Sequence, residues 1–256
     1  MNEIKILPIR TGLIKIKDDL VDKIMEALSR EKIEIEDGDV LVIAETAVSL
    51  TQSRIVRLED VSFSKEAEKL AKEYEMDPRV VEVILNEADE VYGGVKYCLL
   101  TKKNGFLIAN AGVDHSNAPL GHVILFPDNI QYTANKIREK IENKTGKKIG
   151  VIIGDSRTQP LKKGVVGGAL AVSGLEPVED NRGKKDLYGR ELKITFRAIA
   201  DDLTSAAQLL MGESDECIPA VLIKGAKVRL TDNPKNDMFI SPEECLFFNV
   251  FWEKKS

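Results

Sequence analysis

The sequence predicts an α+β fold in which flanking helices cover mixed, largely antiparallel sheets. Short apolar runs typical of buried strands, such as residues 40–44 and 149–153, recur along the chain between segments with helical periodicity. The two kinds of segment do not follow the regular strand–helix alternation of a parallel sheet. The Asn104-Gly105 pair between two apolar runs is typical of a tight hairpin, which joins antiparallel strands.

The apolar pattern also predicts where each element lies. Strands are expected at residues 4–9, 40–44, 97–101, 106–109, 149–153, 169–173, 192–196 and 219–224. Helices are expected from 18 to 28, at 64–74 and 77–86, from 127 to 146, at 199–211, and from 241 to 252. Two of these helices carry start signals. Asp77-Pro78 suits an N-cap followed by proline, and Ser241-Pro-Glu-Glu244 suits a capping box.

Length and composition restrict the class of protein. With 256 residues, 43% of them hydrophobic and 31% charged, the chain suits a globular protein with a sizeable core. We expect one domain spanning residues 1–256 and keep two interleaved subdomains as the alternative. A formal net charge of -5 argues against nucleic-acid binding, which needs a basic surface.

Cysteine usage and hydropathy bear on the location of the protein. Cys98, Cys217 and Cys245 are far apart and odd in number, so they predict neither a zinc site nor a disulfide framework. No apolar run approaches the roughly 20 residues of a membrane span, and the N-terminus lacks the apolar core of a signal peptide. We therefore expect a cytoplasmic protein that does not bind membranes.

One stretch, residues 151–168, combines the residue types that nucleotide chemistry requires. A buried strand is expected to end at Gly154, and Asp155 and Ser156 follow it with oxygens that are hard ligands for a divalent cation. Two lysines come next, together with glycines that let backbone N–H groups approach an anion closely. The structural alternative is a strand, a polar turn with a solvated basic tip, and a glycine-rich second strand.

Other carboxylates are placed to complete a metal site. Asp114 also follows a predicted strand, so that Asp114 and Asp155 together offer two carboxylates to one cation. Glu213 or Asp215, in an acidic loop after a predicted helix, would add a third, although most acidic loops are merely solvated. Because the chain has two histidines, the oxygen ligands, Ser156 included, favour magnesium or manganese over zinc.

Three blocks, taken together and in order, resemble a known family. They are Asn110-Ala-Gly-Val-Asp-His-Ser-Asn117, the stretch 155–168 with Ser173-Gly174, and Asp186-Leu-Tyr-Gly-Arg190 with Leu210-Met-Gly-Glu213. The resemblance is to the gamma-glutamyl ligases of coenzyme F-420, a deazaflavin hydride carrier. It runs from about residue 4 to about residue 225.

The resemblance implies an intertwined homodimer with an α+β fold. It also implies a ligase that joins the amine of L-glutamate to a carboxylate of the deazaflavin precursor of coenzyme F-420. GTP would drive the reaction through an acyl phosphate, with Mg²⁺ or Mn²⁺ and a potassium ion as cofactors.

The resemblance further implies roles for individual residues. The implied metal ligands are Asp114, Asp155, Ser156 and Glu213. The implied nucleotide contacts are Arg10, Thr11, Gly12, Thr46, Asn117, Met211, Gly212, Glu213, Ser214 and Asp215. The catalytic set is Asp114, Asp155 and Lys162, and the substrate-binding set is Arg157, Lys163 and Arg190. For these basic residues, Arg157, Lys162, Lys163 and Arg190, nucleotide binding and a merely solvated surface stay open as alternatives.

The sequence departs from the family pattern beside the implied triphosphate. Leu50 stands where the family has a lysine for the nucleotide phosphates, and an alkyl side chain cannot make charge-assisted hydrogen bonds. Gln52 and Ser53 replace a glutamate and a glycine. Glu45-Thr46 stands where Ser-Thr or Ser-Lys is usual, which adds a negative charge. On sequence alone these two residues are also compatible with ordinary polar positions at a strand end.

Four functions fit these observations. The first is a coenzyme F-420 gamma-glutamyl ligase in the strict sense, and the second is a paralogous amide ligase with another acceptor or nucleotide. The third is a non-catalytic protein that binds a nucleotide or a deazaflavin, and the fourth is a metal-dependent hydrolase. Because three carboxylates directed at one place serve catalysis better than simple binding, we favour a ligase.

Overall fold

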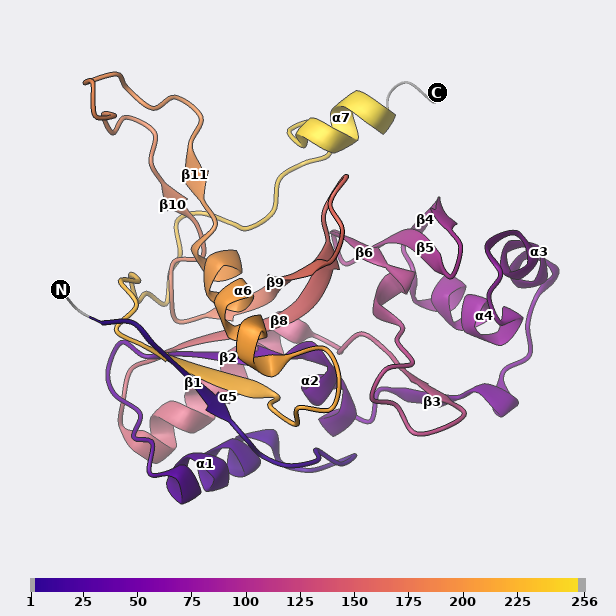
Figure 1. Cartoon of the computed structure of the whole chain (residues 1–256), viewed down its shortest axis with the longest axis horizontal. Coiled ribbons are helices and arrows are strands. Elements are labelled where there is room, and N and C mark those ends of the chain that lie inside the picture. Colours follow the sequence, from indigo (N-terminus) through magenta and orange to yellow (C-terminus); the bar gives the residue numbers. More distant parts are fainter. Residues whose placement is uncertain (1–2, 253–256) are drawn as a thin grey trace.

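A five-stranded sheet forms the centre of the computed structural model, which describes residues 3–252 (Figure 1). Its strands lie in the order β1 (Lys5–Ile9), β12 (Ala220–Lys224), β2 (Val40–Ala44), β8 (Gly150–Thr158) and β9 (Val165–Ser173). Strands β2 and β8 pair in parallel, and the other neighbouring pairs are antiparallel. The predicted α+β class with a largely antiparallel sheet is therefore confirmed.

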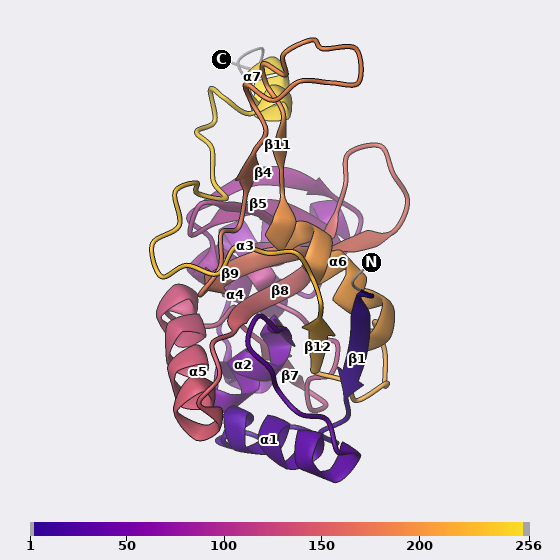
Figure 2. The same ribbon diagram turned by 90° about the vertical axis from the view of Figure 1, so that its left-hand side faces the viewer.

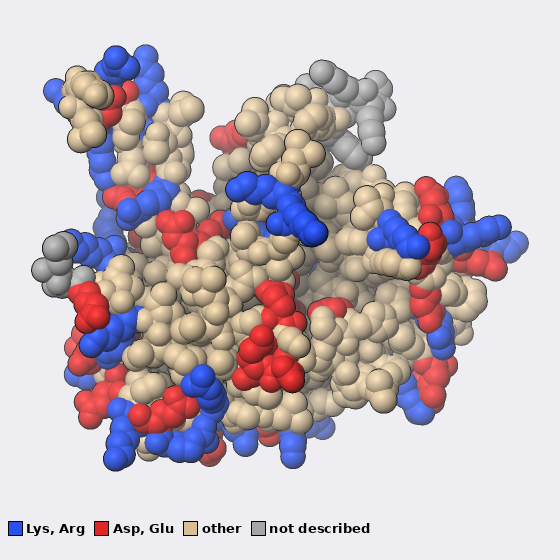
Figure 3. Space-filling model, viewed as in Figure 1, with Lys and Arg blue, Asp and Glu red and all other residues tan. Residues whose placement is uncertain are grey.

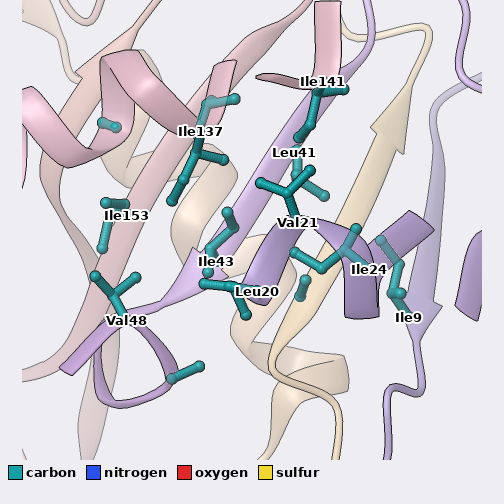
Figure 4. Close-up of a cluster of buried hydrophobic side chains, with 14 of the residues drawn as sticks. Ile9, Leu20, Val21, Ile24, Leu41, Ile43, Val48, Ile137, Ile141 and Ile153 are labelled. Atoms are coloured by element: carbon teal, nitrogen blue, oxygen red, sulfur yellow. The ribbon is translucent and has the colours of Figure 1, made fainter. Parts of the chain in front are cut away.

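Helices cover both faces of this sheet, which explains why strand β2 is apolar at every position. The helices on one face are α1 (Leu20–Glu31), α2 (Glu45–Thr51) and α5 (Ile130–Thr145). Their apolar side chains share one cluster with Leu41, Ile43 and Ile153 of the sheet (Figure 4). On the opposite face, α6 (Ile199–Met211) packs against a cluster that includes Val40 and Val42.

A second core lies beside the central sheet, at the right of Figure 1. Its elements are α3 (Lys65–Tyr74), α4 (Pro78–Glu87), β4 (Glu90–Val95), β5 (Cys98–Lys103) and β6 (Phe106–Ala109). The three strands form an antiparallel sheet, and Val81, Ile84 and Leu99 are buried between it and the helices. The predicted hairpin at Asn104-Gly105 joins β5 to β6. The described chain thus has three apolar clusters, one on each face of the central sheet and one beside it, and the prediction of one domain stays a prediction.

Short elements connect the two cores and extend from them. Strands β3 (Ile55–Arg57) and β7 (His122–Ile124) pair antiparallel, next to the 3-10 turns Leu58–Asp60 and Asn110–Gly112. Strands β10 (Glu179–Asp180) and β11 (Phe196–Arg197) form the base of an arm, residues 179–197, that projects from the body (Figures 1 and 2). The last helix, α7 (Leu246–Trp252), lies on the same side of the molecule. None of the helices formed by residues 3–252 is both long and apolar enough to cross a membrane.

Local chemistry accounts for several of the predicted boundaries. The Asp19 carboxylate accepts a hydrogen bond from the N–H of Asp22 and caps α1, and Ser64 and Asp77 cap α3 and α4 in the same way. Strand β2 and helix α6 have the bounds that the apolar pattern predicts. The sequence did not predict helix α2 or the strands β3, β4, β7 and β10.

Several predicted boundaries are wrong. The strand expected at 149–153 continues to Thr158, so Asp155 and Ser156 lie within β8 and not beyond its end. The strand expected at 192–196 is reduced to Phe196–Arg197, because the rest of this segment forms the exposed arm. The terminal helix begins at Leu246 and not at residue 241. The Ser241 N–H does bond to the Glu244 carboxylate, as in a capping box, but the segment makes only a turn.

The predicted glycine loop is also wrong, because Gly167 and Gly168 lie within strand β9. They pair across the hairpin with Ser156 and Asp155, which extends both strands through the polar stretch. Glycine is required at 167 by the close approach of α6. A Cβ there would lie 2.6 Å from the backbone oxygen of Thr204. The structure therefore matches the alternative of a glycine-rich second strand for this part of the chain.

This close packing predicts the effect of Gly167→Ala. The added methyl would push α6 away from the sheet, and we expect the free energy of unfolding to fall by about 1–3 kcal/mol, the usual cost of overpacking. Urea denaturation would measure the change. The control is Val165→Ala, at an exposed position at the start of the same strand, which should change stability by less than about 0.5 kcal/mol. Equal effects of the two substitutions would contradict the proposed packing role.

Candidate active site

A cavity of about 250 Å³ opens where β2 ends and its parallel pairing with β8 stops. Ala44 at the end of β2 pairs with Gly154 of β8, so that Glu45 and Asp155 follow side by side. The segment after the 3-10 turn Asn110–Gly112 contributes Asp114 to the wall, and the end of α6 with the loop after it contributes residues 211–219. On the face shown in Figure 3, acidic side chains gather at the centre beside a hollow. Ligands commonly bind at such a sheet edge, because neighbouring segments diverge there.

The Asp155 carboxyl group is held in an environment that disfavours its charge. It accepts a hydrogen bond of 2.6 Å from the N–H of Ser156. Burial, with the nearby charges of Asp114 and Glu213, nevertheless raises the pKa of Asp155 to about 6. An ordinary aspartate ionises near pH 3.8, so Asp155 binds a proton far more readily than usual.

Glu45 is the most deeply buried carboxyl group of the cavity wall, with 6% of its surface exposed. Its two oxygens accept hydrogen bonds from the hydroxyls of Ser49, at 3.0 Å, and Thr46, at 3.1 Å. Burial and the charges of Asp155 and Asp114 raise the pKa of Glu45 well above its usual value, and the two hydroxyls offset this only in part.

Asp114 is positioned by its own backbone and by the residues that follow it. Its N–H and C=O bond to the C=O and N–H of Ile124, at 3.0 and 2.8 Å, which fixes the chain next to β7. Its carboxylate accepts hydrogen bonds from the N–H of Ser116, at 2.9 Å, and from the Ser116 hydroxyl. Asn117, in the left-handed region at φ 56°, completes this part of the wall.

The charge of the cavity is one-sided. The residues that line it include the acidic Glu45, Asp114, Asp155 and Glu213, and, within the described part of the chain, no lysine, arginine or histidine. Carboxylates that repel one another in a partly buried place can either take up protons or attract a cation.

The donor atoms suit a hard divalent cation, although they are not arranged as a finished metal site. Between residues 3 and 252, no three Asp, Glu, His or Cys side chains are grouped so that they would hold a metal ion as they stand. The carboxylates of Asp114, Asp155 and Glu213 are nevertheless the type of oxygen ligand that Mg²⁺ and Mn²⁺ take. A bound cation would also neutralise the repulsion between them. The metal prediction therefore stays a prediction.

The structure brings most of the predicted site residues together. The predicted residues that line the cavity are Gly12, Thr46, Asp114, Asn117, Asp155, Ser156, Met211, Gly212, Glu213, Ser214 and Asp215. Arg10 and Thr11 precede Gly12 in the chain but do not line the cavity. Leu50, at the position where the resemblance implies a lysine, is part of the cavity wall.

The basic side chains that were predicted to act in catalysis and substrate binding lie outside the cavity. Arg157 forms an ion pair of 2.8 Å with Asp201 of α6. Lys162 and Lys163 are exposed in the turn between β8 and β9, and Arg190 is exposed on the projecting arm. Their roles in catalysis and substrate binding stay predictions.

Sequence reasoning underestimated Glu45. Glu45 follows strand β2 directly, and strand ends were already expected to hold site residues. Nothing in the local sequence pattern, however, indicates that α6, the Asp114 loop and β8 enclose its side chain. Gln208 and Thr204 of α6 were also missed as wall residues, because they lie on a helix whose apolar face dominates the pattern.

Comparison with known proteins identifies the family. A profile described as F420-0:Gamma-glutamyl ligase matches residues 8–225. The chain belongs to this family. It is therefore an enzyme of the ligase class, and the resemblance predicted from the three sequence blocks is confirmed.

Relatives within the family match over most of their length. The coenzyme F420:L-glutamate ligase of Methanocaldococcus jannaschii is 48% identical over 216 residues, which cover 84% of this chain and 86% of the relative. A ligase of the same name from Methanopyrus kandleri is 44% identical over 214 residues, or 83% of both chains. That of Archaeoglobus fulgidus is 38% identical over 232 residues, or 91% of both chains.

The raised pKa values predict how stability depends on pH. Between about pH 4 and pH 6, the unfolded chain has released the protons of Glu45 and Asp155 while the folded chain still holds them, so these groups make the free energy of unfolding fall as pH rises. Glu45→Gln cannot ionise, and we expect the variant to gain stability relative to the wild type over this range. Below about pH 4 the gain should disappear, because both states are then protonated.

Urea denaturation in metal-free buffer at pH 4, 5 and 6 would measure this difference. Glu26→Gln, at an exposed position on α1, is the control and should show no such trend. A Glu45→Gln variant whose stability relative to the wild type is the same at all three pH values would contradict the raised pKa.

Proposed function

We propose that this protein adds L-glutamate to a carboxylate of the deazaflavin precursor of coenzyme F420, in a reaction that consumes GTP and needs a divalent cation. Membership of the F420-0:gamma-glutamyl ligase family supports the reaction class. The names of the relatives, coenzyme F420:L-glutamate ligases, support the two substrates. The observation that carries the proposal is the single cavity into which Asp114, Asp155 and Glu213 are brought from three separate segments.

The charge of the cavity supports a requirement for cations. A nucleoside triphosphate is a polyanion, and the described wall of the cavity offers it carboxylates but no basic side chain. Leu50 removes the lysine that would otherwise face the phosphates. Asp114, Asp155 and Glu213 would hold the divalent cation, with Ser156 beside them. When bound, such a cation would neutralise the negative charge that shifts between phosphoryl oxygens during the transfer.

The reaction that we propose has two steps. A carboxylate oxygen of the acceptor attacks the γ-phosphorus of GTP, and GDP leaves, which produces an acyl phosphate. The amine of L-glutamate then attacks the acyl carbon, the amide bond forms, and inorganic phosphate leaves. The ammonium group of L-glutamate must lose a proton before it attacks, and the carboxylates of the cavity are the nearby groups able to take it. A potassium ion is a further proposed cofactor.

Two alternatives keep the same cavity but change its use. A paralogous ligase would use another acceptor or nucleotide, as Leu50 and Glu45 suggest by changing the wall next to the implied triphosphate. A non-catalytic binder of nucleotide or deazaflavin would bind GTP without releasing phosphate. Incubation with GTP, Mn²⁺, L-glutamate and the glutamate-free deazaflavin, followed by mass spectrometry of the products, separates the three functions.

We also propose that the protein forms a homodimer through its arm. The arm carries large apolar side chains that the described chain leaves in solvent, with Leu187 100% and Tyr188 87% exposed. Exposed apolar groups of this kind commonly mark a surface that a partner covers. A second copy of the chain, as in the intertwined dimer that the family resemblance implies, would bury them.

Asp155→Asn should lower ligase activity at least about 100-fold, because one of the proposed cation ligands loses its charge. The fold should be retained, since asparagine has nearly the shape of aspartate and lacks the charge that the neighbouring carboxylates repel. Product formation measured by mass spectrometry, with thermal unfolding as a check on the fold, tests this prediction. Asp202→Asn, at an exposed position on α6 outside the cavity, should keep wild-type activity. A wild-type rate in Asp155→Asn would exclude Asp155 from the site.

The dimer proposal predicts that Leu187→Asp weakens self-association at least about tenfold, since a charge would be buried in the interface. Multi-angle light scattering over a concentration series measures the association. Tyr132→Ser, at an exposed position on α5 and outside the arm, is the control. A wild-type protein that stays monomeric throughout the series, or a Leu187→Asp variant that dimerises as the wild type does, would contradict the proposal.

A further inference from the structure

Arg54 is a half-buried cation between helix α2 and the second core. It follows α2 after a short turn and directly precedes β3. Its side chain is 22% exposed, which is low for an arginine. Arg54 does not line the cavity, so a role in the reaction has to act through the residues that it contacts.

The guanidinium group of Arg54 contacts elements of both cores. Nε donates a hydrogen bond of 3.0 Å to the C=O of Phe126, which belongs to the apolar cluster of the central sheet. A terminal N–H donates at 2.8 Å to the carboxylate of Glu87, the last residue of α4 in the second core. The Asp128 carboxylate lies 3.4 Å from Nε. Because a guanidinium is planar and its donors point in fixed directions, Arg54 fixes how these segments are spaced.

The segment that Arg54 holds also supports Asp114. Ile124, two residues before Phe126, exchanges two backbone hydrogen bonds with Asp114, at 3.0 and 2.8 Å. The buried ring of Phe126 packs so closely on Gly112 that a Cβ there would lie 2.8 Å from a ring carbon. Because Gly112 is two residues before Asp114, a shift of Phe126 would move Asp114 as well.

The backbone of Arg54 is tied to the other side of the cavity. Its N–H donates to the C=O of Ser49 at 2.9 Å. The hydroxyl of Ser49 in turn donates to the Glu45 carboxylate at 3.0 Å. The parallel pairing of β2 with β8 places Glu45 beside Asp155. Arg54 therefore lies between the support of Asp114 and the support of Glu45.

We propose that Arg54 is a positioning residue, which sets the spacing between Asp114 and Asp155 so that one divalent cation can reach both carboxylates. The cation rests on the proposed function, whereas the contacts of Arg54 do not. Residues that orient the ligands of a cation, without contacting it, commonly change metal affinity or activity by about 10- to 100-fold when they are replaced.

A geometric role of Arg54 and an electrostatic role have opposite consequences. Removal of a positive charge leaves the surroundings of the cavity more negative, which by itself would tighten the binding of a cation. Loss of the correct spacing between the carboxylates would weaken it. The direction in which the affinity for Mn²⁺ changes in Arg54→Ala therefore distinguishes the two roles.

The chain should still fold without Arg54. Lys103 also pairs with the Glu87 carboxylate, at 3.0 Å, so the substitution leaves no unpaired buried charge there. Arg54→Lys is a second, milder variant. It keeps a positive charge beside Glu87 but lacks the guanidinium geometry that also reaches Phe126.

Arg138 on α5 provides a matched control. Its side chain is 17% exposed, and it bonds to the Ser173 hydroxyl and to the Glu142 carboxylate. Glu142 also pairs with a second cation, Lys148. Arg138→Ala thus removes a comparable set of contacts, but neither Arg138 nor these partners line the cavity.

Isothermal titration of the full chain with Mn²⁺ measures the affinity, and thermal unfolding checks the fold. We expect Arg54→Ala to bind Mn²⁺ about 10- to 100-fold more weakly than the wild type. Arg54→Lys should fall between the two. Arg138→Ala should keep the wild-type affinity for Mn²⁺, although its melting temperature falls as that of Arg54→Ala does.

Four results would overturn the proposal. The first is unchanged or tighter Mn²⁺ binding in Arg54→Ala. The second is an equal loss of affinity in Arg138→Ala, because a general loosening of the fold would then explain both. The third is wild-type affinity in Arg54→Lys, because a charge without the guanidinium geometry would then suffice. The fourth is a wild type that does not bind Mn²⁺, because no cation would then need the spacing.

The failure of the proposed function gives a different result. In that case the wild type binds Mn²⁺ but forms no glutamyl product from GTP, L-glutamate and the deazaflavin. The Mn²⁺ affinities of the variants still decide on Arg54, because this titration needs no substrate. Conversely, product formation by the wild type with unchanged Mn²⁺ binding in Arg54→Ala would reject the positioning role alone.

Discussion

The repulsion between buried carboxylates at the end of a parallel strand pair is the constraint on which the rest of the site depends. Strands β2 and β8 run in the same direction and their pairing ends at Ala44 and Gly154, so the next residues, Glu45 after β2 and Asp155 within β8, reach the same cavity. Asp114 and Glu213 add two more carboxyl groups from other segments. Burial, together with the charges of the neighbouring carboxylates, raises the pKa values of Glu45 and Asp155, so protons partly neutralise these groups when no cation is bound.

The remainder of the fold holds this arrangement in place. Helices on both faces of the central sheet bury its strands, so the end of β2 and the adjacent part of β8 are rigidly placed. Close contact at Gly167 brings α6 onto the sheet, and α6 in turn delivers the loop that carries Glu213 and Glu216. The site thus combines a rigid edge, which supplies Glu45 and Asp155, with loops that can adjust to ligands.

The sequence predicted well those features that short stretches of chain determine. Apolar runs located β2 and α6, the Asp77-Pro78 capping pair located α4, and the Asn-Gly pair located the hairpin after β5. It failed where distant segments decide the outcome. Strand β8 extends through Asp155 because glycines of β9 pair with it. Arg157 forms an ion pair with Asp201, which is on a helix 44 residues further along the chain, so no local pattern could predict this pair. The site carboxylates were recognised individually, but the burial of Glu45 depends on tertiary packing.

Proton release on cation binding tests the central claim most directly. If the cavity holds its carboxylates partly protonated, Mn²⁺ must displace those protons when it binds. Isothermal titration with Mn²⁺ at pH 6, in two buffers with different ionisation enthalpies, counts the protons released. The account predicts roughly one proton per bound cation in the wild type and less in Asp155→Asn. Binding of Mn²⁺ without proton release, or no binding at all, would contradict it.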